Sequence, residues 1–258
     1  MIDAPYGSGK TSTIAALVSH ALHINENLKI VVISKNNATI TTNVQRFQAN
    51  TNQSDVSATR LITPENFFSD PNIRTQLDLP HQILTNTRQC AKSEDNIAQL
   101  YDQYITTEKK PDRQSPTELY GLRRKITSTV RSQQTKALAS LKPQVIFATT
   151  DTLWSAFKEG VTYTGLLIID EAIQLRPIDL LFFCTELPTS TKIVLVGDIH
   201  QLDPYTPTQM SRSTLMKMGA GNALSLVSLY GSARMHHLTS VFRSHTLVVR
   251  RSSDTLWW

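Results

Sequence analysis

Residues 4–11 read APYGSGKT, a glycine-rich segment that ends in a lysine and a threonine. Phosphate-binding loops follow the pattern Gly, four residues, then Gly-Lys-Ser/Thr. Gly9, Lys10 and Thr11 match it, Gly7 adds a second flexible position, and Ala4 replaces the first glycine. Glycines allow backbone N–H groups to turn inward around phosphate oxygens, and the helix that follows presents its positive end. We therefore expect the phosphates of a nucleotide to lie against Ala4, Gly7, Ser8, Gly9, Lys10 and Thr11.

Two side chains of this loop have separate chemical tasks. Lys10 would neutralise the β- and γ-phosphates, and the Thr11 hydroxyl suits Mg²⁺, which prefers oxygen ligands. The alternative is a glycine-rich turn that only caps a helix. A strand stub at residues 1–3 and a helical pattern after the loop favour nucleotide binding. The expected ligands are ATP and Mg²⁺.

The sequence around the loop predicts alternating helices and strands. Residues 11–21 place apolar side chains along one helical face, residues 29–34 (KIVVIS) predict a buried parallel strand, and a second helix is expected over 39–48. Short apolar strands follow at 145–149, 166–170 and 192–197. This order predicts an α/β fold with a doubly wound parallel sheet. Ligands of such sheets bind beyond the carboxyl ends of the strands.

A polar, largely helical insertion interrupts the α/β pattern. Residues 82–141 predict two helical arms joined by a bend around 109–115, near Pro111 and Pro116. The second arm is basic, as is typical of a solvated helical face; its cations are Arg123, Arg124, Lys125, Arg131 and Lys136. We expect the first part of the ATP-binding lobe at 1–50, the insertion at 51–142, the second part at 143–249 and an irregular tail at 250–258.

Two adjacent carboxylates end the strand in residues 166–172, which read LLIIDEA. Asp170 suits the outer shell of Mg²⁺, and Glu171 suits the general base that orients or deprotonates the attacking water. Alone, the pair could cap the next helix. Together with the loop before Lys10, it predicts that both elements converge on one magnesium-bound triphosphate.

A third motif makes the pattern specific. Residues 197–204 have the form Gly-Asp-x-x-Gln-Leu-x-Pro. The segments APYGSGKT, LLIIDEAIQ, VLVGDIHQLDP and LTSVFRSH, in this order, resemble the superfamily 1 helicases of the group that includes the nonsense-mediated-decay helicase. The resemblance covers residues 4 to about 245. It implies a RecA-like lobe of a P-loop NTPase, in which ATP hydrolysis drives translocation along single-stranded RNA or DNA.

The resemblance also implies roles for further residues. Gln201 would contact the γ-phosphate and couple the nucleotide state to the nucleic acid. Gln174 would lie near the same water or phosphate. Arg243 would reach the γ-phosphate, where a cation stabilises developing charge. Phe242 would pack on the adenine.

Nucleic-acid contacts are expected at two strand ends. Asn37, in the segment SKNNA, and Thr149 with Thr150 resemble family positions that touch the nucleic-acid backbone. Hydroxyls and amides can hold phosphates without recognising sequence. Either segment could equally be a helix-capping turn.

A helicase of this group needs a second RecA-like lobe, and no segment here matches one. We expect that lobe in the full-length protein, and slow hydrolysis by this chain without its arginine finger. A non-motor nucleotide-binding regulatory module is the alternative. A DEAD-box helicase is a second alternative, disfavoured by the Gln-Leu-x-Pro segment. The choice between RNA and DNA stays open.

Composition sets broad limits on the class of protein. The 258 residues are 40% hydrophobic and 18% charged, as in globular proteins, and the formal charge of +5 mildly favours a polyanionic partner. Cys90 and Cys184 have no metal-ligand spacing and are expected to be unpaired thiols. The sequence has no apolar run of about 20 residues and no signal peptide. We expect a soluble monomer in the cytoplasm or nucleus, without a membrane partner.

Overall fold

The computed structural model describes residues 1–5, 7–50, 56–69, 74–89, 97–108, 116–158, 165–201, 211, 213–214, 221–224, 227 and 234–238. The chain forms two compact units. Unit 1 consists of Met1–Val56 and Thr162–Trp258, and unit 2 consists of Ser57–Val161. Among the described residues, none of the helices could span a bilayer.

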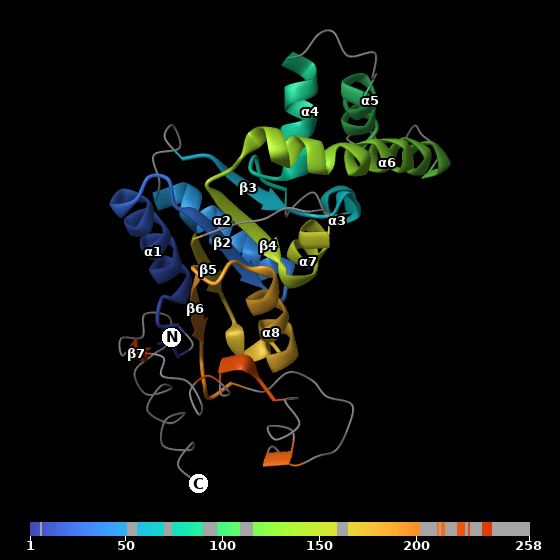
Figure 1. Cartoon of the computed structure of the whole chain (residues 1–258). Coiled ribbons are helices and arrows are strands. Elements are labelled where there is room, and N and C mark those ends of the chain that lie inside the picture. Colours follow the sequence, from blue (N-terminus) through green and yellow to red (C-terminus); the bar gives the residue numbers. More distant parts are fainter. Residues whose placement is uncertain are drawn as a thin grey trace. The chain divides into compact units, whose positions relative to one another are not determined.

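Unit 1 contains a parallel sheet flanked by helices (Figure 1). Its strands lie in the order β2, β5, β6, β1, β7, and every pairing recorded among them is parallel. The strands and helices, in chain order, are β1 (Ile2–Asp3), α1 (Lys10–Ile24), β2 (Lys29–Ser34), α2 (Asn37–Asn50), β5 (Gly165–Ile169), a 3-10 helix (Ala172–Gln174), α8 (Pro177–Glu186), β6 (Lys192–Gly197) and β7 (His236–His237). The predicted α/β class with a parallel sheet is confirmed.

The core of unit 1 explains why these segments are strands and helices. Strand β2 is buried from Ile30 to its end, as the continuous β-branched run predicts. Helix α1 buries Ile14, Val18 and Leu22, which lie on one face at helical spacing. Helix α2 likewise buries Ile40, Val44 and Phe47.

Unit 2 contains two parallel strands and the helical insertion (Figure 1). Its elements are β3 (Ala58–Leu61), α3 (Pro64–Ser69), α4 (Leu79–Gln89), α5 (Ile97–Glu108), α6 (Pro116–Leu141), β4 (Val145–Thr149) and α7 (Thr150–Lys158). Helices α4, α5 and α6 confirm the predicted helical character of the insertion. The predicted bend at 109–115 and the tail lie outside the described residues, as does Cys90.

Two details differ from the sequence-based expectation. Strand β5 ends at Ile169, so Asp170 is the first residue after the strand and not its last. Strand β3 was not predicted at all, because its sequence ATRL lacks an apolar run. It is nevertheless buried at every position and pairs with β4.

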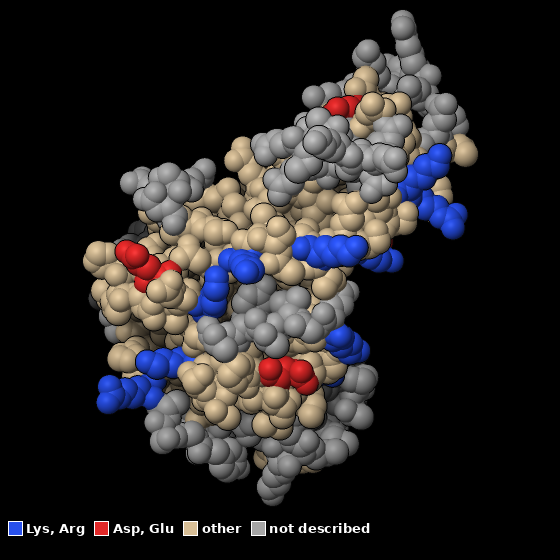
Figure 2. Space-filling model, turned by 45° about the horizontal axis from the view of Figure 1, so that its top comes forward, with Lys and Arg blue, Asp and Glu red and all other residues tan. Residues whose placement is uncertain are grey.

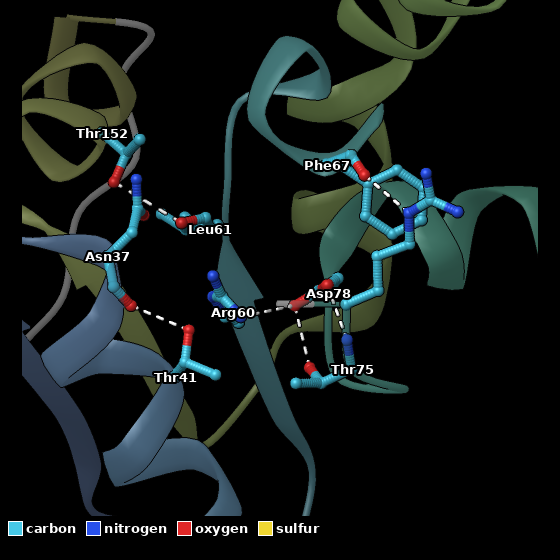
Figure 3. Close-up of polar contacts among 9 residues, drawn as sticks. Asn37, Thr41, Arg60, Leu61, Phe67, Thr75, Asp78 and Thr152 are labelled. Carbon is cyan, nitrogen blue, oxygen red and sulfur yellow. Dashed lines mark hydrogen bonds and ion pairs between the residues drawn. The ribbon is translucent and has the colours of Figure 1, made fainter. Parts of the chain in front are cut away.

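An ion pair explains how β3 buries a charged residue (Figure 3). Arg60 Nη1 lies 3.5 Å from Asp78 Oδ1, and both side chains are fully buried. Thr75 donates to Asp78 through its backbone N–H and its hydroxyl, each at 2.8 Å. Burial raises the pKa of the Asp78 carboxyl, and the charge of Arg60 opposes this shift. The ion pair thus connects Asp78, the residue before α4, with β3.

Basic side chains are prominent on the surface. Figure 2 shows Lys and Arg spread over the visible face, with few Asp or Glu beside them. The sequence of α6 contains five Lys or Arg residues and has no Asp or Glu from Arg123 to Leu141.

Candidate functional site

The loop after β1 has the backbone geometry of a phosphate-binding turn. Gly7 and Gly9 have φ angles of 80° and 86°, which side-chain-bearing residues rarely adopt. Helix α1 begins directly after Gly9, at Lys10, so its amino end faces the loop. The loop is anchored by the N–H of the fully buried Ala4, which donates to the carbonyl of Gly197 at 2.7 Å.

Lys10 folds back onto its own loop. Its ammonium group donates to the carbonyl of Ala4 at 2.8 Å and to that of Pro5 at 3.4 Å. These are neutral acceptors, and phosphate oxygens form stronger, charge-assisted hydrogen bonds with an ammonium group. A triphosphate can therefore replace both contacts.

Asp170 is held rigidly at the carboxyl end of β5. Its backbone N–H donates to the carbonyl of Ile33 at 2.7 Å, and its side chain is 2% exposed. Asn43 Nδ2 donates to one carboxylate oxygen at 2.8 Å, and the N–H of Glu171 donates to the other at 2.9 Å. Burial raises the pKa of the Asp170 carboxyl, and the bond from Asn43 partly offsets this rise.

Glu171 has an uncommon backbone conformation. Its φ of 53° places it in the left-handed region, where a side chain costs roughly 1–2 kcal/mol. Asn36 Nδ2 donates to Glu171 Oε2 at 3.0 Å, and the N–H of Gln174 donates to the Glu171 carbonyl at 2.8 Å. Outliers of this kind are often found at functional sites.

One cavity of about 640 Å³ brings the loop and the acids together. It is lined by Gly7, Gly9, Lys10, Thr11, Asp170, Glu171 and Gln201, all of which the sequence pattern proposed as site residues. Ala4 and Ser8 do not line it but are buried in the loop that forms its edge. The glycine turn and the carboxylates thus face a single space.

Helix α2 forms a second wall that sequence reasoning missed. Thr39, Thr42, Gln45 and Arg46 line the same cavity, and Arg46 donates to the Ser12 hydroxyl through Nε at 3.0 Å and Nη2 at 2.8 Å. The signal was available in the sequence. Polar residues recur every three or four positions beside the apolar stripe of residues 37–50, which is typical of a helix with two contact faces.

The turn after β6 positions Gln201. Asp198 is buried and accepts hydrogen bonds from the backbone N–H of His200 at 3.0 Å and from Gln201 Nε2 at 3.5 Å. The backbone N–H of Ile199 donates to Asp3 in β1 at 3.2 Å. Gln201 therefore sits on a turn that is tied to the strand before the glycine loop.

The residues expected to contact nucleic acid lie where α2 and α7 begin. Asn37 is the first residue of α2, and its carbonyl accepts from Thr41 Oγ1 at 2.8 Å (Figure 3). In unit 2, Thr149 and Thr150 are buried, and Thr149 Oγ1 lies 2.9 Å from Thr152 Oγ1. Phe242 and Arg243 lie outside the described residues.

The donors present fit Mg²⁺. Thr11 and Asp170 offer a hydroxyl and a carboxylate to the cavity, and hard oxygen ligands of this kind suit that ion. Ser8 Oγ and Asn43 Oδ1 are buried and have no hydrogen-bond partner within the described part of the chain. Such atoms leave hydrogen-bonding capacity for phosphate oxygens or for water on a bound cation. No cluster of three or more His, Cys, Asp or Glu that could hold a metal occurs among the described residues.

Comparison with known proteins identifies the family. The model of a family described as "AAA domain" matches residues 1–209. No curated protein matches the chain. One solved structure, a nuclease-deletion mutant of the Type ISP restriction-modification enzyme LlaGI in complex with a DNA substrate mimic, is 13% identical with a TM-score of 0.38. The match covers 85% of this chain and 18% of that one, so this chain spans less than a fifth of the enzyme's length.

Proposed function

Because the chain belongs to the AAA domain family, whose P-loop implies binding of a nucleoside triphosphate, we propose that it is the ATP-binding lobe of an ATP-dependent helicase. In the full-length protein, hydrolysis would drive movement along single-stranded RNA or DNA. One observation carries the proposal: the glycine turn before Lys10 and the carboxylates Asp170 and Glu171 line one cavity of about 640 Å³.

The residues proposed for the site have separate tasks in phosphoryl transfer. Lys10 leaves the carbonyls of Ala4 and Pro5 and binds the β- and γ-phosphates, while backbone N–H groups of the loop bind phosphate oxygens. Glu171 orients the attacking water and accepts its proton. Gln201 contacts the γ-phosphate from the turn after β6.

Thr11 and Asp170 would hold Mg²⁺, directly or through water. The ion would neutralise phosphate charge that Lys10 alone cannot balance. Asn43 keeps the Asp170 carboxylate oriented through its 2.8 Å hydrogen bond. Phe242 would pack on the adenine and Arg243 would reach the γ-phosphate.

Nucleic acid would contact the chain at Asn37, Thr149 and Thr150. A second RecA-like lobe would close on the nucleotide and supply an arginine finger, a contribution of about 10³–10⁵ in rate in related enzymes. We therefore expect this chain to hydrolyse ATP slowly. Its expected location is the cytoplasm or nucleus.

A binding and turnover experiment on the full chain tests the proposal. Lys10→Ala should weaken binding of a fluorescent ATP analogue by tenfold or more, because the phosphates lose their cation. Glu171→Gln should keep nucleotide binding and lower any turnover by about 10²–10⁴-fold, as expected for loss of a general base.

The matched control is Lys192→Ala, an exposed lysine at the start of β6 and thus at the opposite end of the strand from the cavity. It should bind like the wild type. If Lys10→Ala bound the ATP analogue as tightly as the wild type does, the proposed position of the phosphates would be wrong. Binding and turnover that never respond to RNA or DNA, even in the full-length protein, would favour the non-motor regulatory module.

A further inference from the structure

Helix α2 carries a second cation to the nucleotide cavity. Helices α1 and α2 pack against each other in unit 1 (Figure 1). Arg46, in α2, lines the cavity together with Thr11 and Glu171. The Arg46 side chain is exposed and is not needed to fill the core. A ligand in this cavity can therefore reach the Arg46 guanidinium.

The guanidinium of Arg46 rests on a neutral acceptor. Its Nε and Nη2 atoms donate to the Ser12 hydroxyl at 3.0 Å and 2.8 Å. These two atoms form an edge of the guanidinium that can bind two oxygens of a phosphate at once. In the structure, both donors converge on a single uncharged oxygen. The terminal phosphate of a nucleotide offers several charged oxygens, so it can replace the hydroxyl with stronger hydrogen bonds.

The contact with Ser12 places this guanidinium at the phosphate-binding end of α1. Ser12 follows Thr11, the expected Mg²⁺ ligand, in the first turn of the helix. Side chains of a helix lean toward its amino end. Asn36, the residue before α2, donates to Glu171 Oε2, so the amino end of α2 lies beside the expected general base. Arg46 therefore extends toward the part of the cavity where the γ-phosphate is expected.

The charge balance of the cavity favours a second cation at the phosphates. Among the described residues that line it, Asp170 and Glu171 are acidic, and Lys10 and Arg46 are basic. With Lys10 alone, the lining would be negative when both acids are ionised, and a magnesium-bound triphosphate adds further negative charge. Arg46 brings the charge of the lining to zero. A cation at this place also stabilises the charge that develops on the γ-phosphate during transfer.

We propose that Arg46 binds the γ-phosphate and makes the cavity selective for a nucleoside triphosphate over a diphosphate. When ATP binds, the Nε–Nη2 edge leaves the Ser12 hydroxyl and donates to two γ-phosphate oxygens, while Lys10 binds between the β- and γ-phosphates. ADP lacks these oxygens, so Arg46 stays on Ser12 when ADP is bound. The chain thus detects the γ-phosphate without a second RecA-like lobe. This role rests on the proposed function, which supplies the ligand.

Nucleotide affinities of the full chain test this role. Displacement of a fluorescent ADP by unlabelled ADP or by a non-hydrolysable ATP analogue, each with Mg²⁺, gives the two values of Kd. Arg46→Ala should weaken binding of the ATP analogue by about tenfold or more, because charge-assisted hydrogen bonds are lost, and change the Kd of ADP by less than about twofold. Arg46→Lys keeps the charge without the two-donor edge, so its affinity for the ATP analogue should be intermediate.

Two control variants separate phosphate binding from a structural link between α1 and α2. Ser12→Ala removes the same pair of hydrogen bonds but leaves the guanidinium in place, so it should keep the preference for the ATP analogue over ADP. If Arg46 only connected the helices, Ser12→Ala and Arg46→Ala would instead weaken both nucleotides alike. Arg176→Ala removes another exposed arginine of unit 1, one that does not line the cavity, and should bind both nucleotides as the wild type does.

The same measurements distinguish failure of this role from failure of the proposed function. If Arg46→Ala weakened the ATP analogue and ADP equally, or weakened neither, Arg46 would not bind the γ-phosphate. Lys10→Ala should weaken both nucleotides, because Lys10 also contacts the β-phosphate. If Lys10→Ala bound both as tightly as the wild type does, the proposed function itself would be wrong. A loss of affinity in Lys10→Ala without a selective loss in Arg46→Ala would remove only the role of Arg46.

Discussion

At the scale of single residues, the candidate site depends on one buried carboxylate whose charge is costly. Asp170 is 2% exposed, and burial is the main cause of its raised pKa. A group whose pKa is higher in the folded than in the unfolded chain favours folding in its protonated form. The free energy of unfolding therefore falls as the pH rises from the ordinary Asp value of 3.8 through the raised pKa of Asp170.

Asp170→Asn removes this cost, because an amide stays neutral while it can still accept the hydrogen bond from Asn43. We expect the melting temperature of the nucleotide-free protein to rise by a few degrees at pH 8. The gain should shrink as the pH falls toward 4, where Asp170 itself becomes protonated. Thermal melts at pH 5 and pH 8 measure it. A gain that is larger at pH 5 would contradict the assigned cause of the pKa shift.

At the scale of secondary-structure elements, β3 depends on the Arg60–Asp78 pair. Removing one partner of a buried ion pair usually costs about 3–5 kcal/mol, because the other charge stays buried. We expect Asp78→Ala to lower the free energy of unfolding by about this amount and to speed amide hydrogen exchange in β3. Denaturant titration with hydrogen exchange measures both.

Two control variants separate this effect from a general loss of charge. Arg60→Met/Asp78→Leu removes both charges and should recover most of the lost stability. Arg176→Ala breaks an exposed pair with Asp179 and should change the free energy of unfolding by no more than about 1 kcal/mol. If Asp78→Ala lowered the free energy of unfolding no more than Arg176→Ala does, the buried ion pair would not be what stabilises β3.

The elements also show what the sequence could and could not predict. β2, β4 and β6 match their expected bounds. Each consists mainly of apolar residues, which can be buried in a sheet without an ion-pair partner. β3 was missed because Arg60 is compatible with a strand only once Asp78 is beside it. Local pattern does not reveal such a long-range pair. Lys10, Asp170 and Glu171 belong to local motifs, so the sequence alone predicts them as site residues. Asn36 and Asn43 bind the two acids across more than 100 positions in the sequence, and a local pattern does not predict such contacts.

At the scale of the whole molecule, the candidate nucleotide site belongs to unit 1, whereas β3 and β4 belong to unit 2. A ligand that binds only the folded state stabilises it by about 2.7 kcal/mol at 100 times its Kd. We expect an ATP analogue with Mg²⁺ to slow hydrogen exchange in α1 and at the end of β5, in unit 1, and to leave β3 and β4 of unit 2 unchanged.

Mass-spectrometric hydrogen exchange with and without the analogue measures this pattern. A single-stranded oligonucleotide should instead slow exchange at the starts of α2 and α7, where Asn37 and Thr150 lie. Equal protection of both units by the ATP analogue alone would show that they respond as one body to nucleotide.

The left-handed backbone at Glu171 also limits which amino acids this position can accept. Gly, and to a lesser extent Asn or Asp, adopts a φ of 53° with less strain than Glu does. A lineage released from the need for a carboxylate here would gain stability by drifting to glycine. Retention of glutamate at this position in a related chain therefore indicates continued selection for its carboxylate. Replacement by glycine is the first change expected in a relative that has lost catalytic activity.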